Sequence, residues 1–256
     1  MKGKVFLVGA GPGTPDLLTV RALEVIRSAE VVLYDQLAGE IIAMLPPAAE
    51  KIDCGKFGGK HTLEQEEIEA IMVRHALAGK NVVRLKGGDP FLFGRGGEEL
   101  EVLREHGIPV ELVPGVTSAI AVPGCVGIPV THRRYASQVT VITGHEDPVK
   151  EGSAIAWETL ARSAGTIVIL MGVKNLPQIV SQLVTHGQDP GTAVAIIERG
   201  LQKDERVITG TLGDIVATAH AKEVRPPAVI VIGDVVRLYA GEHLCRKSAE
   251  NVRRGT

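Results

Sequence analysis

The stretch Val82–Leu103, "VVRLKGGDPFLFGRGGEELEVL", runs from an apolar segment through a glycine-rich loop into a segment of helical character. The loop, Gly87–Glu99, holds five glycines, a proline and two aromatic residues. Ordering so many glycines costs chain entropy, so we expect this backbone to approach something closely. The stretch therefore predicts a buried strand over Val82–Leu85, a loop suited to a ligand, and a helix from Gly97 to about His106.

The same order of strand, loop and helix recurs along the chain. Short β-branched runs predict further buried strands over Lys4–Val8, Val31–Tyr34, Val110–Val113, Val139–Thr143, Thr166–Met171, Ala193–Ile197 and Ala228–Ile232. Helices are expected over Asp16–Ser28, Thr62–Ala78 (with a capping-box pattern at Thr62–Gln65), Thr117–Val126, Ile155–Ser163, Asn175–His186 and Leu212–Ala219. This alternation predicts two α/β domains.

The expected domain limits follow from changes in composition. Residues 1–131 form the N-terminal domain and residues 138–240 the C-terminal domain, because Gly127–Gln138 carries a proline and a basic pair without apolar periodicity and is typical of a linker. The polar stretch 241–256 has no pattern and is expected to be a frayed tail.

Composition excludes several classes of protein. The 256 residues are 45% hydrophobic and 23% charged, as in ordinary globular proteins, and a net charge of −2 offers no broad basic surface for nucleic acid or an acidic membrane. No apolar run reaches the ~18 residues that span a bilayer, and the N-terminus lacks a secretory apolar segment. Cys54, Cys125 and Cys245 are odd in number and far apart, which predicts reduced thiols in a cytoplasmic protein.

The first expected strand also ends in glycines, at Gly9, Gly11 and Gly13. Ligands of open α/β sheets bind beyond the carboxyl ends of strands, so the position suits a site, although a tight strand-to-helix turn would need the same residues. The dinucleotide fingerprint is incomplete, because Thr14 stands where a third glycine is required and Pro12 removes an N–H. Nicotinamide cofactors are therefore disfavoured.

Asp89 is the polar residue that stands out in the second glycine loop. Its carboxylate suits a ribose hydroxyl or an amino group better than a phosphate. The alternative is an Asp-Pro turn that leads into the next helix.

Several segments together resemble one family. "VGAGPGTPDLLTVRAL", "VVLYDQL", "RLKGGDPFLFGRGGEEL", "PGVTSAIAVPGCVGIPVTHR", "TGH", "ILMG" and "PPAVIVIGDVV" are similar to the tetrapyrrole methyltransferases, in order from about Lys4 to Val236. "GAGPG" is shared by the wider family, whereas "GGDPFLFGRGGEE" with "GIPVTHR" is similar to the members that methylate C2 and C7 of uroporphyrinogen III to give precorrin-2. The resemblance implies two α/β domains with a cofactor cleft between them, a homodimer, and S-adenosylmethionine (SAM) as methyl donor.

The resemblance also implies which residues contact the cofactor and the substrate. Small residues and backbone would give adenosine close walls with few polar anchors. The SAM contacts would be Pro12, Gly87, Gly88, Asp89, Leu92, Thr117, Ser118, Met171, Gly200 and Ala228. The carboxylates of the tetrapyrrole would be bound by Arg95, Arg133, Arg134, Lys60 and His61, each of which could equally be an ordinary surface group.

Two further residues match catalytic positions of the family. Asp35 would accept a proton and Lys56 would donate one, because methylation of a ring carbon leaves a proton to be moved. The alternatives are a turn-capping Asp35 and a solvated loop lysine. His132 and His145 have no metal-ligand spacing, so no metal is expected.

Other functions stay open at this point. The chain could methylate ribosomal RNA or a protein on the same fold, or it could be a nucleotide-binding module without catalysis. The net charge of −2 disfavours RNA. Because the motifs begin almost at Met1, no dehydrogenase or ferrochelatase domain is expected before them, and the product would feed the formation of sirohaem or cobalamin.

Overall fold

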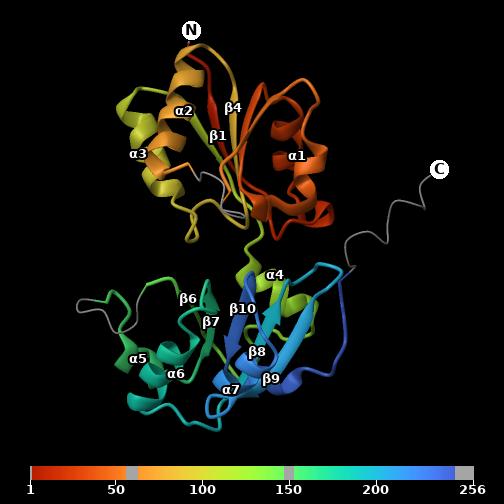
Figure 1. The fold of residues 1–256 in the computed structure, drawn as a ribbon, viewed down its shortest axis with the longest axis vertical. Helices are drawn as coiled ribbons and strands as arrows, with labels where there is room; N and C mark the ends of the chain where they lie inside the picture. Colours follow the sequence, from red (N-terminus) through yellow and green to blue (C-terminus); the bar gives the residue numbers. More distant parts are fainter. Residues whose placement is uncertain (1, 56–62, 147–152, 246–256) are drawn as a thin grey trace, which may run out of the picture. The chain divides into compact units, whose positions relative to one another are not determined.

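The computed structural model describes residues 2–55, 63–146 and 153–245. The chain divides into an N-terminal unit, Met1–Ser118, and a C-terminal unit, Ala119–Thr256 (Figure 1). Each unit is built on its own five-stranded sheet. The α/β class with two such units is as the sequence predicts.

The N-terminal sheet is parallel throughout and has the order β3-β2-β4-β1-β5. Its strands are β1 (Val5–Gly9), β2 (Val31–Tyr34), β3 (Glu50–Asp53), β4 (Val82–Lys86) and β5 (Val110–Val113). Its helical elements are η1 (Pro15–Leu17), α1 (Val20–Arg27), η2 (Gln36–Met44), α2 (Gln65–Leu77) and α3 (Gly96–Glu105).

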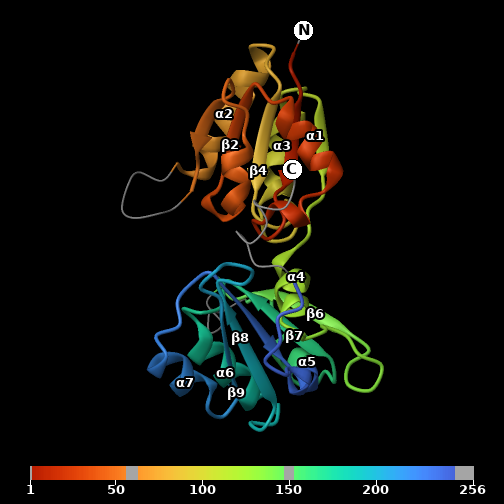
Figure 2. The same ribbon diagram turned by 90° about the vertical axis from the view of Figure 1, so that its right-hand side faces the viewer.

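Side chains of this sheet alternate between two buried layers, because successive residues of a strand point to opposite faces. One face packs on α1 and η2, with Val83 and Leu85 of β4 in that core. The other face packs on α2 and α3 and includes Val82 (Figures 1 and 2). Arg84 and Lys86 share the face of Val82, so the alternation sends two cations into the layer below α2 and α3.

The C-terminal sheet is mixed and has the order β6-β7-β10-β8-β9, in which only the β6–β7 pair is parallel. Its strands are β6 (Val139–Thr143), β7 (Thr166–Leu170), β8 (Ala193–Glu198), β9 (Arg206–Thr211) and β10 (Ala228–Ile232). α5 (Trp157–Ala161), α6 (Leu176–Thr185) and α7 (Ile215–Ala221) pack on one face of it (Figure 2), and α4 (Ser118–Cys125) and η3 (Asp234–Leu238) complete the described elements.

The boundary between the two units lies earlier in the chain than the sequence predicts. The division lies between Ser118 and Ala119 rather than near residue 131, because α4 packs on the C-terminal unit. A Cβ on Gly200 would lie 2.4 Å from a methyl group of Val122 on α4, which shows how closely this helix and the loop after β8 approach.

Two helix starts also differ from the prediction. α1 begins at Val20 because the hydroxyl of Thr19 accepts the N–H of Ala22 and caps the helix, and the preceding residues form the separate turn η1. α2 begins at Gln65 with a capping box between Glu64 and Glu67, so the predicted start at Thr62 is too early; Thr62 itself lies outside the described residues.

Among the described residues, no helix is long and apolar enough to cross a membrane.

Candidate functional site

The carboxyl ends of β1, β2, β4 and β5 lie at one edge of the N-terminal sheet, because these strands are parallel. β1 and β4 lead into the two glycine loops of the sequence, and an isolated bridge joins them, with N–H···O distances of 2.7 and 3.2 Å between Gly88 and Gly11. The loop after β5 carries Thr117 and Ser118 to the same edge. The structure thus brings together the cofactor contacts predicted for the first unit.

Close backbone packing explains some of the glycines at this edge. A Cβ on Gly115 would lie 2.2 Å from the carbonyl oxygen of Gly88, and a Cβ on Gly9 would lie 2.5 Å from the N of Gly115. Gly88 differs, because the nearest atom to its own Cβ position is the Cα of Thr117 at 3.9 Å. Its φ of +69° requires glycine, yet the space beside it is open to a ligand.

Asp89 organises the second glycine loop. Its Oδ1 accepts the N–H of Phe91 at 2.9 Å and its Oδ2 accepts the N–H of Gly115 at 3.1 Å. The Asp-Pro turn and the tie to the loop after β5 are therefore both present, and either oxygen keeps a lone pair for a ligand.

The aromatic residues of this loop are exposed, as the sequence suggests. Phe91 and Phe93 keep 48% and 40% of their surface accessible. Phe93 and Arg95 have φ values of +55° and +60°, which are costly for residues with a side chain and are found most often at functional sites. Arg95 forms an ion pair with Glu98 at 2.6 Å, so its guanidinium is already partnered.

Asp35 follows β2, and its carboxylate is held from within the unit. The guanidinium Nη2 of Arg84 donates to its Oδ1 at 2.7 Å. The Asp35 side chain is 26% exposed, whereas that of Arg84 is 3% exposed. The carboxylate therefore lies at the border between a buried network and the strand-end edge.

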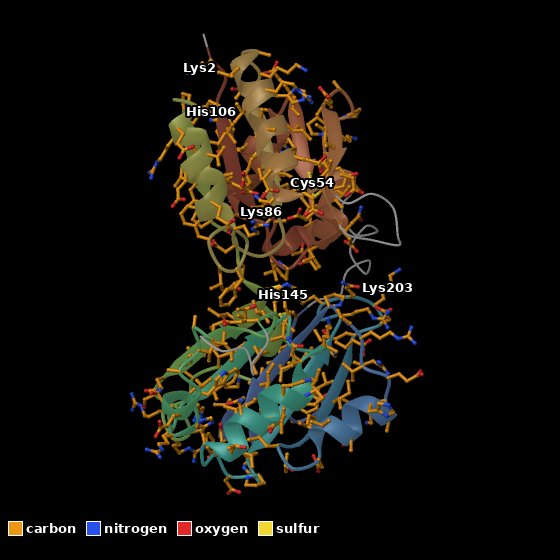
Figure 3. All side chains as sticks on the ribbon, turned by 60° about the vertical axis from the view of Figure 1, so that its left-hand side comes forward. Lys2, Cys54, Lys86, His106, His145 and Lys203 are labelled. Atoms are coloured by element: carbon orange, nitrogen blue, oxygen red, sulfur yellow. A yellow bond between two sulfur atoms is a disulfide. The ribbon has the colours of Figure 1, made fainter. Side chains whose placement is uncertain are left out.

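The network below Asp35 centres on Glu99 of α3. Its Oε1 accepts from Nε of Arg84 at 3.0 Å, from Nζ of Lys86 at 2.8 Å and from Nε2 of Gln65 at 3.3 Å. Burial and the charge of Arg84 lower the pKa of Lys86 (Figure 3), against the opposing effect of Glu99. Burial also lowers the pKa of Arg84, but the carboxylates of Asp35 and Glu99 outweigh it, so the net shift is upward and the guanidinium stays charged.

Cys54 lies next to this network (Figure 3) and is a free, buried thiol. Burial is the main cause that raises its pKa to about 11, so it stays protonated and is not a nucleophile.

The remaining predictions for the first unit are less informative. Pro12 and Leu92 are partly exposed residues of the two glycine loops, as a ligand contact requires. Lys56, Lys60 and His61 lie outside the described residues.

The three cofactor contacts predicted for the C-terminal unit also share one sheet edge. β10 is antiparallel to both β7 and β8, and Ala228 at its start is paired with Glu198 at the end of β8. Met171, which follows β7, and Gly200, which follows β8, therefore lie at the same edge as Ala228. Met171 is 50% exposed and has a φ of +57°, a second strained position at a predicted site.

Arg133 and Arg134 lie in a turn closed by the His132–Ala136 bridge. Both side chains are exposed, and with Tyr135 they line a pocket that extends to Ala164. The guanidinium of Arg134 lies 5.9 Å from the centre of the Tyr135 ring. The pair is thus presented by an ordered turn rather than by an unstructured linker.

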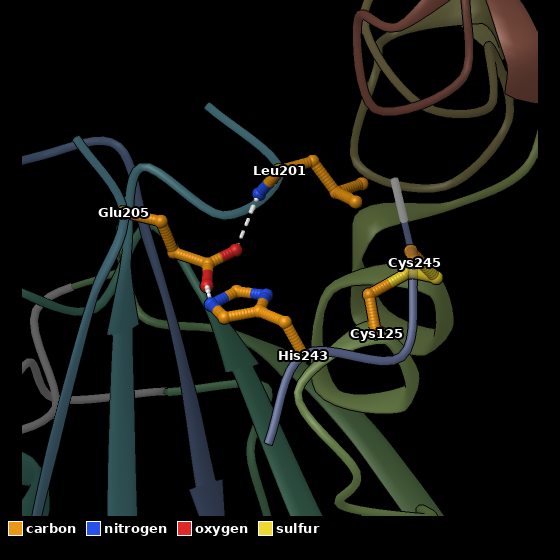
Figure 4. The surroundings of a disulfide bond; sticks show 5 residues. All are labelled: Cys125, Leu201, Glu205, His243 and Cys245. Atoms are coloured by element: carbon orange, nitrogen blue, oxygen red, sulfur yellow. Dashed lines mark hydrogen bonds and ion pairs between the residues drawn. A yellow bond between two sulfur atoms is a disulfide. The ribbon is translucent and has the colours of Figure 1, made fainter. Parts of the chain in front are cut away.

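The prediction of reduced cysteines is wrong for two of the three. Cys125 at the end of α4 and Cys245 form a disulfide (Figure 4), and the N–H of Leu244 donates to the Cys125 carbonyl at 2.8 Å. The sequence could not reveal this pair, because the residues are 120 positions apart. Because two of the three cysteines form a disulfide, the cysteines no longer indicate a reducing compartment.

The same contacts correct the prediction of a frayed tail for its first residues. His243 lies 2.6 Å from Oε1 of Glu205, and Oε2 of Glu205 accepts the N–H of Leu201 at 2.7 Å (Figure 4). Residues 241–245 are therefore anchored beside the loop that follows β8, and residues 246–256 lie outside the description.

Across the described parts of the chain, no group of three or more His, Cys, Asp or Glu side chains could hold a metal ion. His145 is an exposed residue after β6, and His132 stacks near the Tyr135 ring with centroids 5.0 Å apart.

Sequence reasoning missed Arg84, Lys86 and Glu99. A signal was present, since two cations alternate in an otherwise apolar strand, and buried charges are found in pairs. Their partner on α3 is one of several glutamates in that helix and becomes distinguishable only in three dimensions.

The strand-end loops of the two α/β units combine close-packed glycines with left-handed residues, an arrangement typical of α/β proteins that bind small ligands beyond the ends of their strands. Residues 4–216 match the family model of the Tetrapyrrole (Corrin/Porphyrin) Methylases, and the chain belongs to this family.

Similar proteins cover nearly the whole chain. The S-adenosyl-L-methionine-dependent uroporphyrinogen III methyltransferase of Methanosarcina barkeri is 58% identical over 93% of each chain, and the uroporphyrinogen-III C-methyltransferase of Methanocaldococcus jannaschii is 52% identical over 93% of this chain and 98% of its own. Among solved structures, the uroporphyrin-III C-methyl transferase of Thermus thermophilus in complex with S-adenosyl homocysteine has a TM-score of 0.78 at 43% identity and covers 93% of this chain and 100% of its own.

Proposed function

We propose that the chain transfers methyl groups from SAM to C2 and then C7 of uroporphyrinogen III, giving precorrin-2 by way of precorrin-1. The observation that carries the proposal is the edge of the N-terminal sheet, where open space lies beside Gly88 after β4 and the partly exposed carboxylate of Asp35 follows the neighbouring strand β2. The relatives named for this reaction, at 52% and 58% identity over nearly full length, support it. The product would feed the formation of sirohaem or of cobalamin, since other similar proteins are named a siroheme synthase and a cobalamin biosynthetic enzyme.

The residues at this edge fit SAM as cofactor. A ligand that approaches Gly88 meets backbone rather than side chain, and Pro12 does not weaken the fit because SAM has no phosphate that needs its N–H. Gly87, Gly88, Asp89, Leu92, Thr117 and Ser118 would hold it in the first unit, and Met171, Gly200 and Ala228 would do so in the second. When bound, the cofactor supplies an electrophilic methyl group on a sulfonium.

The chain's own part in this reaction is mainly positioning, because an in-line methyl transfer needs alignment rather than a covalent intermediate. A neutral ring carbon that gains a methyl cation becomes positively charged, and loss of a proton restores neutrality. Asp35 is the proposed acceptor of that proton, and the partial exposure of its carboxylate, whose Oδ1 is held by Arg84, supports this role. Lys56 stays the proposed proton donor.

The substrate carries a carboxylate on every one of its side chains. Arg133 and Arg134, presented beside Tyr135, are proposed to bind such groups, with Lys60 and His61. Arg95 would have to exchange Glu98 for a substrate carboxylate, which is possible because this ion pair is half exposed and weak.

We propose that the active enzyme is a homodimer and that it is located in the cytoplasm. Light scattering after gel filtration measures the assembly directly: a mass of one chain, 27.1 kDa, would contradict the dimer.

The decisive test of the function is turnover. The purified protein, given SAM and uroporphyrinogen III generated in the same vessel, should form the chromophore of the dimethylated product and release about two equivalents of S-adenosylhomocysteine per substrate. Release of the thioether only with RNA or protein added, or SAM binding without turnover, would contradict the proposal.

A further inference from the structure

A charged cluster that the proposed chemistry does not use directly lies under Asp35. Glu99 is fully buried, and the side chains of Arg84 and Lys86 are 3% and 4% exposed. With Asp35 the cluster holds two cations and two anions, so it is neutral as a whole. Buried ion pairs are a poor source of stability, because packed apolar side chains in their place are often as stable or more so.

Glu99 is the centre of the cluster. A single oxygen, Oε1, accepts from both cations and from Gln65 of α2, which ties β4, α2 and α3 together. The second oxygen, Oε2, is buried without a hydrogen-bond partner among the described residues. All three donors therefore meet at a single oxygen of Glu99.

The cluster reaches Asp35 through one side chain. Nε of Arg84 is held by Glu99 at 3.0 Å, and Nη2 of the same guanidinium is held by Asp35 at 2.7 Å. Because a guanidinium is planar and rigid, fixing Nε on one side fixes the direction in which Nη2 points on the other. The backbone brings Asp35 to this point, since its N–H donates to the carbonyl of Leu85 at 3.2 Å.

We propose that Glu99 is a positioning residue for methyl transfer: it anchors Arg84 so that the Asp35 carboxylate is held in one orientation at the end of β2. The inference rests on the proposed role of Asp35 as the base. A stabilising role does not explain why these charges are buried. A base whose orientation is fixed before the substrate binds would explain it.

The test is a double-mutant cycle between Glu99 and Asp35. Glu99→Met removes both oxygens that could hold Arg84, whereas the amide of a glutamine would still accept from its Nε. Alone it leaves an excess buried cation, so it is combined with Lys86→Met, which restores neutrality. We expect the pair E99M/K86M to lower kcat by about 10- to 100-fold, as a misplaced catalytic group does, with the Kd for S-adenosylhomocysteine changed by less than about twofold. Glu101→Gln, on the exposed side of the same helix, is the matched control and should leave both values unchanged.

The cycle is completed in the Asp35→Asn background. If Glu99 acts through Asp35, the pair E99M/K86M should lower kcat there by less than about twofold. A further loss as large as that in the wild-type background, or wild-type kcat in E99M/K86M itself, overturns the positioning role while leaving the base intact. Full activity of Asp35→Asn alone overturns the base, and the positioning role with it.

A crystal structure of E99M/K86M supplies a readout that does not depend on turnover. We expect the guanidinium of Arg84 to leave Oδ1 of Asp35 or to bind it in a new direction. If the 2.7 Å contact is unchanged, Glu99 does not position the pair, and this holds even if the chain proves to act on another substrate.

Discussion

Two buried glutamates, one in each unit, differ in whether their cationic partners reach solvent. Glu99 of the N-terminal unit and Glu198 of the C-terminal unit are 0% and 1% exposed, and each is paired with two cations. The partners of Glu99 are as buried as it is, whereas Arg199 and Arg206, the partners of Glu198, keep 38% and 44% of their side chains accessible. The two cations beside Glu198 can be solvated when the pair is broken, but Arg84 and Lys86 cannot.

The difference follows from strand position. β4 is the central strand of a parallel sheet covered on both faces, so a charged residue of β4 has no route to water. β9 is an edge strand, and Arg206 extends from it to cover the end of β8. A cluster of the first kind is costly to bury, and this one ends at Asp35, as the positioning role proposed for Glu99 requires.

The largest expected effect therefore comes from Glu99→Gln compared with Glu198→Gln. Removing the carboxylate of Glu99 leaves Arg84 and Lys86 with only Asp35 as counter-ion, so one buried positive charge is uncompensated, which costs about 3–5 kcal/mol of local stability. The same change at Glu198 should cost about 1 kcal/mol, because its arginines turn to solvent. Hydrogen exchange by mass spectrometry measures both, through the protection of amides in β4 and α3 for the first variant and in β8 for the second.

Equal losses in the two variants would contradict this comparison. They would mean that the exposure of the partner cations does not decide the energy of a buried carboxylate in this chain.

The sequence predicted strands well where an apolar, β-branched run lies between turn residues. β2, β5, β6 and β10 have the predicted bounds for this reason, although β5 and β6 are edge strands. β3 and β9 were missed, since "EKID" and "RVITGT" are polar segments whose pairing depends on a neighbour far along the chain. The apolar content of a segment, rather than its place in the sheet, decided whether it was predicted.

The parts of the candidate site that depend on backbone conformation could be predicted from the sequence. The loops around Gly11 and Gly88 stand out because conformations with positive φ and close approach require glycine. Glu99 could not be distinguished from its neighbours Glu98 and Glu101, because only the packing of α3 on the sheet determines which glutamate faces Arg84.

A second contrast between the units is the disulfide, which lies in the C-terminal unit. The variant Cys125→Ser/Cys245→Ser should lower the stability of that unit by about 2–4 kcal/mol, because the crosslink closes a long loop of chain. The single tryptophan, Trp157, lies in the core of the C-terminal unit, so its fluorescence during urea unfolding reports this unit. Dithiothreitol should lower the wild-type midpoint in the same way and leave the variant unchanged. A wild-type midpoint that is indifferent to the reductant would show that the crosslink does not form.

The smallest effect on folding is expected at Gly88, where a substitution changes the backbone conformation and leaves the charge unchanged. Gly88→Ala places no atom within 3.9 Å of its new Cβ, so its cost is that of a φ of +69°, about 1–2 kcal/mol. Gly97→Ala, in the first turn of α3 with no neighbour within 4 Å, is the matched control and should stabilise the unit by up to about 1 kcal/mol.

Calorimetry with S-adenosylhomocysteine then separates the effect of Gly88→Ala on folding from its effect on binding. If the open space beside Gly88 is where the cofactor lies, a methyl group there should weaken binding by about tenfold or more, while Gly97→Ala leaves the Kd unchanged. Unchanged affinity in Gly88→Ala would mean that this glycine serves the turn alone and that the cofactor lies elsewhere along the strand ends.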